Sequence, residues 1–281
     1  MIYSQPHIKY IYEPLEINRY NPYRNMIPII PLNKKHSKRQ LLMLKKYFNE
    51  IVLQGKLRGY SQWNFFNKNY NFITERYVVK LLNALPLIDW FANNFDIKII
   101  YLIRHPIPTS LSIMRKNWKN TNNKYLYNPD FINKYLTEEM LECSNKIMKK
   151  GNNMNKFILE WCLKHLYPLS VCNKRDWLTI TYEELLLKPR KMIDLICEYL
   201  DLPDREKMLK SMLKPSKRAD NHSKKDIIMK GSSYLVYRWK KDIKVEIECE
   251  AMSILETFGI DSYNQGSIMP SEKFLHFGSL G

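Results

Sequence analysis

The fold is decided by one stretch of sequence in which an apolar run leads into a basic turn: Lys98-Ile99-Ile100-Tyr101-Leu102-Ile103-Arg104-His105-Pro106-Ile107-Pro108-Thr109-Ser110-Leu111-Ser112. The nearly continuous apolar run over residues 97–103 predicts a strand that is covered on both faces, as in a parallel sheet. Arg104 falls where this strand ends, and ligands of open parallel sheets bind at that end. The stretch therefore predicts a binding site at Arg104.

A helix is expected directly after this strand. Pro106 and Pro108 stop the strand, because proline cannot donate a ladder hydrogen bond. Thr109 or Ser110 can cap the helix that follows, which is predicted over residues 110–118. The local order is then strand, turn and helix N-terminus.

Arg104 and Ser112 are the polar side chains that this arrangement would present to a ligand. A fixed cation and a hydroxyl can hold one anion, and the positive end of the helix dipole adds to the attraction. The other interpretation is a structural Arg104 that pairs with a carboxylate. The stretch alone leaves both interpretations open.

The composition is that of a globular chain. Its 281 residues are 45% hydrophobic, which is enough for a sizeable core, and we expect one large domain over residues 1–281. No run is long enough to span a membrane and the first residues do not resemble a signal peptide, so we expect a soluble, cytoplasmic protein. The five cysteines form no CxxC pair and the six histidines have no metal-ligand spacing. These patterns predict neither a disulfide framework nor a metal site.

The net charge of +17 favours polyanionic or phosphorylated ligands. A basic nucleic-acid-binding protein is therefore the alternative function, and the Tyr and Trp residues scattered among lysines support it. The sequence contains no zinc-finger, helix-turn-helix or RNP pattern, so nucleic acid is not the expected partner. Lysine, asparagine, isoleucine and tyrosine are abundant throughout the chain, as also happens when a coding sequence is biased towards A and T. The charge by itself therefore does not identify a ligand.

Three more strands are predicted, and each ends next to a polar residue: 8–12 before Glu13, 77–80 ending in Lys80, and 177–182 before Glu183. Helical periodicity predicts helices over residues 37–52, 81–95, 137–149, 157–172, 190–200 and 243–258. Strands that alternate with helices at this spacing predict an α/β fold with a parallel sheet.

Two polar regions fit no core. Residues 119–155 are rich in Asn and Lys and are either an insertion that binds an acceptor or a solvated surface. The basic residues 214–230 are either a flap over an anionic ligand or a solvated loop.

With these elements placed, the sequence resembles the sulfotransferase superfamily, whose members transfer a sulfuryl group from 3′-phosphoadenosine 5′-phosphosulfate to a hydroxyl or amine. Residues 99–106, with Ser112 eight residues after Arg104, are similar to the family's 3′-phosphate-binding motif. The run Thr179-Ile180-Thr181-Tyr182-Glu183-Glu184-Leu185 resembles the strand and helix around the nucleotide, and the resemblance places Tyr182 at the adenine. Lys230-Gly231 with Tyr237-Arg238-Trp239-Lys240 resembles the segment that closes over the 3′-phosphate, with a different spacing.

The resemblance also implies a catalytic base. In some branches of the family a Glu near the position of Glu13 is the base, whereas in cytosolic members it is a His two residues beyond the Lys that matches Lys80. Here that residue is Leu82. The departure makes Glu13 the candidate base, and no metal is required in this scheme.

The fold implied by the resemblance is a P-loop-like parallel sheet flanked by helices. Family members begin with a strand and a Gly/Ser/Thr-rich loop that wraps the 5′-phosphosulfate. This chain has eight glycines, none of them before Gly55, and no such run. We therefore expect the N-terminal strand and phosphate loop to be missing, either from a fragment or from a degenerate member, and expect sulfuryl transfer to be weak or absent. The class of the acceptor and the oligomeric state stay open.

Overall fold

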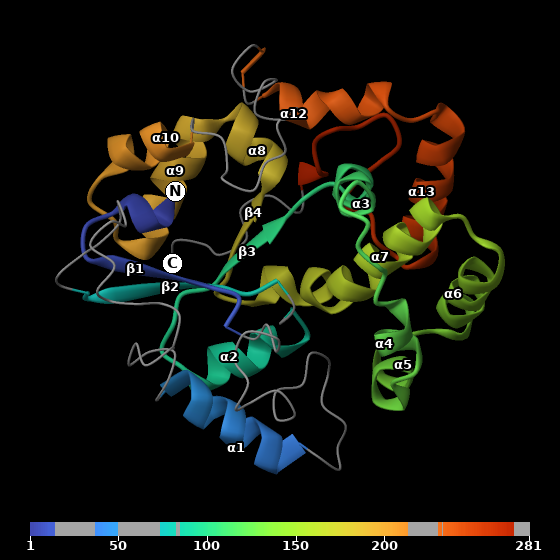
Figure 1. Cartoon of the computed structure of the whole chain (residues 1–281), viewed down its shortest axis with the longest axis horizontal. Helices are drawn as coiled ribbons and strands as arrows, with labels where there is room; N and C mark the ends of the chain where they lie inside the picture. Colours follow the sequence, from blue (N-terminus) through green and yellow to red (C-terminus); the bar gives the residue numbers. More distant parts are fainter. Residues whose placement is uncertain (15–36, 50–73, 83–84, 213–229, 232, 273–281) are drawn as a thin grey trace. The chain divides into compact units, whose positions relative to one another are not determined.

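The computed structural model describes residues 1–14, 37–49, 74–82, 85–212, 230–231 and 233–272 (Figure 1). These residues form two compact units, Met1–Ile97 with Pro203–Ser211, and Lys98–Leu202 with Met212–Gly281. Each unit contains one pair of parallel strands among helices, which confirms the α/β class. The four described strands form two separate sheets of two strands, whereas the sequence predicts one sheet. A single domain over residues 1–281 stays a prediction.

The first unit is built on strands β1 (Ile8–Tyr12) and β2 (Arg76–Lys80), which confirm two predicted strands. They pair in parallel, with Tyr12 opposite Lys80, so both strands end at the same edge. The helices of this unit are α1 (Ser37–Tyr47), α2 (Ile88–Asn94) and α10 (Arg205–Met212), with short 3-10 turns η1 (Ile2–Ser4) and η4 (Leu85–Leu87).

The core of the first unit joins α1 and α2 to β1. Its buried members are Ile11, Leu44, Tyr47, Phe48, Leu87 and Phe91. Leu44 and Tyr47 lie three residues apart on the apolar face of α1, as the helical periodicity predicts. Complete burial of one such side chain contributes roughly 1.5–3 kcal/mol to folding. The last three residues of the predicted helix 37–52 lie outside the described residues.

The beginning of the chain is fastened to the segment that carries α10. The buried amide of Gln5 donates from Nε2 to the Asp204 carbonyl at 2.6 Å, and its Oε1 accepts from the Asp204 N–H at 3.0 Å. This two-way contact joins residues 199 positions apart in the sequence.

The second unit is built on β3 (Ile100–Ile103) and β4 (Leu178–Thr181), which also pair in parallel, with Ile103 opposite Thr181 (Figure 1). Each strand passes directly into a helix, β3 into α3 (Pro106–Met114) and β4 into α8 (Tyr182–Leu187). The longest helix, α7 (Asn153–Val171), packs against α3 and against α13 (Val245–Thr257). This unit also contains η5 (Cys172–Lys174), α9 (Pro189–Leu200), α12 (Tyr234–Tyr237) and η6 (Arg238–Lys241). Of these, α9 contacts β4 and η6 contacts α3.

The start of α3 differs from the sequence prediction. The helix begins at Pro106, four residues earlier than expected, because proline suits the first helical position, where no N–H is needed. His105 is the N-cap, and its Nδ1 accepts from the Ile107 N–H at 3.3 Å. The prediction that Thr109 or Ser110 caps the helix is therefore wrong. The Thr109 hydroxyl instead donates to the His105 carbonyl at 2.9 Å.

Residues 119–155 contain more structure than predicted. The expected helix is α6 (Glu138–Lys150), and the Thr137 hydroxyl caps it by accepting from the Met140 N–H at 3.3 Å. Two short helices, α4 (Asn122–Leu126) and α5 (Pro129–Tyr135), were not predicted. The sequence signal for α5 is the pair Asn128-Pro129, because the Asn128 side chain accepts from two N–H groups of α5. None of the helices in the described part is both long and apolar enough to cross a membrane.

Candidate functional site

Arg104 and Tyr182 meet at the ends of the two strands of the second unit. Because β3 and β4 are parallel and Ile103 lies opposite Thr181, the next residue of each strand emerges at the same edge. The guanidinium carbon of Arg104 lies 4.3 Å from the centroid of the Tyr182 ring. A cation over an aromatic face at this distance is an attractive contact. Two of the five predicted nucleotide-binding residues are therefore in contact.

Arg104 keeps hydrogen-bonding capacity that the described residues do not use. Its carbonyl accepts from the Trp161 indole N–H at 3.1 Å, which fixes the backbone. Its side-chain Nε is buried and has no hydrogen-bond partner within the described ranges. Where the structure describes the chain, Arg104 takes part in no ion pair. The ion pair that lies nearest to it in the sequence joins Arg115 to Asp242. A buried donor on a fixed cation is suited to an anionic ligand.

His105 lies at the centre of the site and is fully buried. Its backbone N–H donates to Glu183 Oε1 at 3.0 Å. Its ring packs against the rings of Trp239 and Tyr263, each with its centroid 4.6 Å away. The pKa of His105 is lowered to about 3, first by burial and then by the charges of Lys240 and Arg104. Through its backbone N–H and its neutral ring, His105 thus joins the stretch around residue 104 to those around residues 183, 239 and 263.

Glu183 connects these stretches through both of its carboxylate oxygens. Oε1 accepts from the His105 N–H, and Oε2 accepts from the Tyr263 hydroxyl at 3.0 Å. Only 1% of Glu183 is exposed. Burial raises the pKa of Glu183, and the two donors and the Arg104 charge offset part of that rise. Burial and the neighbouring Glu183 also raise the pKa of Tyr263 well above its usual value.

Ser112 lies on α3 beyond the turn that follows Arg104, and it is half-buried. Its hydroxyl makes no hydrogen bond within the described part of the chain. The strand-turn-helix order is confirmed, while a shared anion at Arg104 and Ser112 stays a prediction.

Lys230 and Gly231 are exposed, and they lie beside Tyr234. The Lys230 ammonium is 4.3 Å from the Tyr234 ring centroid. Gly231 has φ +80, in the left-handed region that favours glycine. Further along the same segment, the Trp239 ring packs against the His105 ring and so belongs to the site. The predicted flap over residues 214–230 lies, apart from Lys230, outside the described residues.

Glu13 belongs to the first unit, where it follows β1 at the strand edge. It is buried, and its Oε1 accepts from the Leu82 N–H at 2.6 Å. Its own N–H donates to the Lys80 carbonyl at 2.9 Å. Its φ of +46 is uncommon for a residue with a side chain, and such conformations persist where the surroundings enforce them. The carboxylate of Glu13 thus lies against the residue two positions beyond Lys80.

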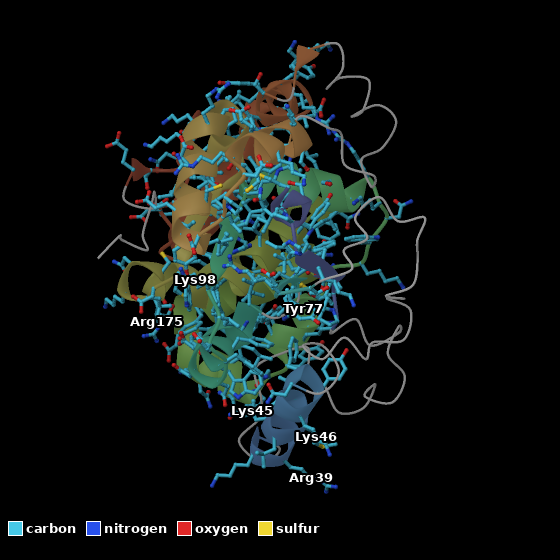
Figure 2. All side chains as sticks on the ribbon, turned by 90° about the vertical axis from the view of Figure 1, so that its left-hand side faces the viewer. Arg39, Lys45, Lys46, Tyr77, Lys98 and Arg175 are labelled. Atoms are coloured by element: carbon cyan, nitrogen blue, oxygen red, sulfur yellow. The ribbon has the colours of Figure 1, made fainter. Side chains whose placement is uncertain are left out.

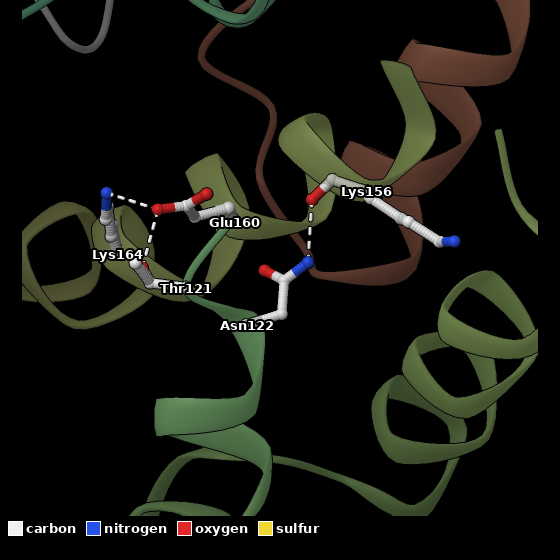
Figure 3. A network of polar contacts seen from close by, with 5 residues as sticks. All are labelled: Thr121, Asn122, Lys156, Glu160 and Lys164. Carbon is white, nitrogen blue, oxygen red and sulfur yellow. Dashed lines mark hydrogen bonds and ion pairs between the residues drawn. The ribbon is translucent and has the colours of Figure 1, made fainter. Parts of the chain in front are cut away.

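The predicted insertion over residues 119–155 is anchored on α7 (Figure 3). The Thr121 hydroxyl and the Lys164 ammonium both contact Glu160 Oε1, each at 2.6 Å. The Asn122 amide donates to the Lys156 carbonyl at 2.8 Å. Acceptor binding by residues 119–155 stays a prediction.

Part of the positive charge lies on α1, where Figure 2 labels Arg39, Lys45 and Lys46. Arg39 and Lys46 are exposed, and the half-buried Lys45 donates to Asn94 at 3.4 Å. Cations on one face of an amphipathic helix are the ordinary solvated face of such a helix. They do not by themselves define a nucleic-acid interface. Among the described residues no group of three or more His, Cys, Asp or Glu side chains could hold a metal ion.

Comparison with known proteins identifies the family of this chain. The model of the "Sulfotransferase family" matches residues 14–206, which is more than half of the 281 residues. The chain belongs to the sulfotransferase family. The part that matches the sulfotransferase model contains Arg104, Ser112 and Tyr182, and it ends before Lys230. A search of curated proteins gives no match.

Among solved structures, the sulfotransferase domain from the curacin biosynthetic pathway is similar to this chain, with a TM-score of 0.41 and 14% identity. The alignment covers 91% of this chain and 98% of that domain.

Sequence analysis did not identify four residues of this cluster around Arg104 as candidate site residues: His105, Trp161, Glu183 and Tyr263. The signal for Glu183 was present, because it directly follows Tyr182 at a strand end. His105 follows Arg104 in the same way. Trp161 and Tyr263 come from α7 and from the segment after α13, and no local pattern connects either of them to Arg104.

Proposed function

We propose that the second unit binds 3′-phosphoadenosine 5′-phosphosulfate, with Arg104 and Ser112 at the 3′-phosphate and Tyr182 at the adenine. The observation that carries the proposal is the Arg104 side chain, which lies 4.3 Å over the Tyr182 ring and has a buried Nε without a partner in the described part. A cation and an aromatic face, side by side, match the phosphate and the base of one nucleotide. Lys230 and Gly231 would add charge and a close backbone approach on the 3′ side.

The reaction that follows from family membership is transfer of the sulfuryl group to a hydroxyl or amine of an acceptor. The acceptor atom attacks sulfur in line while the bond from sulfur to the 5′-phosphate oxygen breaks. As in phosphoryl transfer, the protein mainly positions the reactants and stabilises charge. Glu13 would take the proton from the acceptor, since a shielded carboxylate is a suitable general base.

Calorimetric titration with adenosine 3′,5′-bisphosphate tests the nucleotide site. We expect binding to the wild type and a loss of at least about tenfold in affinity for Arg104→Ala, because a hydrogen bond to a charged group contributes about 1.5–3 kcal/mol. Arg115→Ala is the matched control. It removes the same charge just after α3, from an exposed residue that is paired with Asp242. Its affinity should equal that of the wild type.

Two results would overturn the proposal. One is no binding of the bisphosphate to the wild type. The other is equal affinity in the wild type and Arg104→Ala. A fluorescence titration with duplex DNA runs beside these experiments, because salt-dependent DNA binding without nucleotide binding would favour the nucleic-acid alternative.

A further inference from the structure

We propose that Glu183 and Tyr263 are positioning residues that hold the backbone at His105 and thereby keep Arg104 over Tyr182. The proposal rests on the proposed nucleotide site, and it adds two residues that the motif comparison did not supply. Neither residue is placed against the ligand. Glu183 acts through His105, whose N–H it binds, and Tyr263 acts through Glu183, to which its hydroxyl donates.

The first step of the argument is the hydrogen bond that crosses between the two strand ends. The pairing of β3 with β4 stops at Ile103 and Thr181. Beyond that point the backbone of residues 104–105 has no ladder to hold it. The His105 N–H lies at the N-cap of α3 and donates to Glu183 Oε1 at 3.0 Å. A carboxylate is stabilised at this end of a helix by the dipole.

The second step is the position of these partners in the sequence. His105 directly follows Arg104, and Glu183 directly follows Tyr182. The hydrogen bond from His105 to Glu183 therefore sets the separation of the two residues that would bind the nucleotide. A shift of this contact by an ångström would move the guanidinium relative to the ring by a similar amount, and misplacement of that size is costly at functional sites.

The third step is the role of Tyr263. Its hydroxyl donates to Glu183 Oε2 at 3.0 Å, and its ring packs on His105. Only 2% of Tyr263 is exposed. It thus contacts both partners of the hydrogen bond between the strand ends. With both oxygens occupied and almost no exposure, Glu183 is suited to positioning and has no free access to a substrate proton.

The segment that carries Tyr263 is itself fixed. The Gly266 N–H donates to Glu248 of α13 at 2.7 Å, and the Gly266 carbonyl accepts from the Lys240 ammonium. The Ser271 N–H donates to the Ser262 carbonyl at 2.9 Å, which closes a loop around Tyr263. Tyr263 therefore approaches Glu183 from a constrained loop.

The test compares two nucleotides that differ only in the 3′-phosphate, adenosine 3′,5′-bisphosphate and adenosine 5′-monophosphate, by calorimetric titration of the full chain. If Glu183 positions Arg104, Glu183→Ala, which removes the acceptor of the His105 N–H, should lose about tenfold in affinity for the bisphosphate and less than about twofold for the monophosphate. Glu183→Gln keeps one acceptor oxygen and should change the ratio of the two affinities in the same direction by a smaller factor. Tyr263→Phe should change the ratio of the two affinities in the same direction by a smaller factor. A purely structural role would not change this ratio.

Glu160→Gln is the matched control, because Glu160 is also a buried carboxylate of the second unit and binds Thr121 and Lys164 instead. Its ratio should equal that of the wild type. Near-ultraviolet circular dichroism monitors the folded state of each variant. Should Glu183→Ala not fold, Tyr263→Phe decides the question, since it removes one hydroxyl and keeps the ring.

The outcomes are distinct. A wild type that does not bind the bisphosphate overturns the proposed nucleotide site and this inference with it. Binding by the wild type with an unchanged affinity ratio in folded Glu183→Ala and Tyr263→Phe overturns this inference alone. An equal loss of affinity for both nucleotides also overturns it, because it would show a general structural role.

Discussion

The carboxylate of Glu13 is hydrogen-bonded to the backbone N–H of Leu82 at 2.6 Å, and this contact joins residues 69 positions apart at the edge of the β1–β2 pair. Leu82 is the residue that corresponds, by the resemblance, to the catalytic histidine of cytosolic members of the family. The contact gives Glu13 a structural function as well as the proposed chemical one. Two substitutions separate these functions.

Glu13→Ala should lower the free energy of unfolding by about 1–2 kcal/mol, because it removes the acceptor of the Leu82 N–H. Glu13→Gln keeps an acceptor oxygen and should cost less than about 1 kcal/mol. Urea unfolding measures both. The exposed Glu75, changed to Gln, is the control. Equal stability of Glu13→Ala and the wild type would contradict the structural function.

Because the phosphate loop is expected to be missing, sulfuryl transfer by the wild type is expected to be weak. Glu13→Gln should leave the affinity for adenosine 3′,5′-bisphosphate unchanged and lower this weak transfer by at least about 100-fold, as expected for loss of a general base. Transfer of labelled sulfate from the donor measures the effect. A variant that is as active as the wild type would show that Glu13 is not the base.

The aromatic face of Tyr182 is expected to contribute more than its hydroxyl. Tyr182→Ala should weaken bisphosphate binding roughly 5- to 100-fold, since stacking of one base contributes about 1–3 kcal/mol. Tyr182→Phe should stay within about twofold of the wild type. The control is Tyr127→Ala, because Tyr127 is 79% exposed and lies after α4. Unchanged affinity in Tyr182→Ala would remove Tyr182 from the site.

Acid should destabilise the second unit. Burial lowers the pKa of His105 and of His165 to about 3, whereas an unfolded histidine has a pKa of about 6.5. The folded state therefore binds fewer protons than the unfolded state, and stability falls as the pH decreases from about 6.5 toward 3. Urea unfolding between pH 7.5 and 4.5 should show this fall. His165→Gln, which loses the 2.5 Å contact with the Tyr101 hydroxyl, should be less stable at pH 7.5 and less sensitive to acid. If the free energy of unfolding of His165→Gln changed with pH as steeply as that of the wild type, His165 would not be a source of the acid sensitivity.

Glu183 contributes to the pH dependence of stability with the opposite sign. Its pKa is raised by burial, so the folded state holds that proton more tightly than the unfolded state does. The associated stability is present below the pKa of an unfolded Glu and is lost as the pH rises through the raised value. In Glu183→Gln the acid destabilisation caused by the histidines should therefore be steeper than in the wild type.

The anchor of the insertion can be tested apart from the nucleotide site. Asn122→Ala removes the contact with the Lys156 carbonyl and should lower the free energy of unfolding by about 1–3 kcal/mol. Asn123→Ala changes an exposed neighbour and should have little effect. Neither variant should change the affinity for the bisphosphate. A loss of that affinity in folded Asn122→Ala would connect the insertion to the nucleotide site.

The strands were predictable from sequence because apolar, β-branched runs that end in a charge are a local signal. β1 has the predicted bounds, and β2, β3 and β4 lie within three residues of theirs. The start of α3 was predicted wrongly because the two prolines were interpreted as strand breakers, although Pro106 is also an excellent first helical residue. The helices α4 and α5 were missed because segments of five and seven residues are too short to show a helical periodicity.

The site itself was predictable only in part. Arg104 and Tyr182 were found because each follows a strand, and parallel strands bring such residues together. The contact of Tyr263 with Glu183 spans 80 residues, and that of Trp161 with Arg104 spans 57. No local pattern encodes a partner at that distance, since it depends on how α7 and the segment after α13 pack.

The contact between Gln5 and Asp204 has a consequence for synthesis on the ribosome. Gln5 is synthesised 199 residues before Asp204, so its buried amide has no partner until that segment has been added. Contacts of such long range slow folding. The first unit can therefore complete its structure only after residue 204 has been synthesised, and until then β1 is a natural target for chaperones.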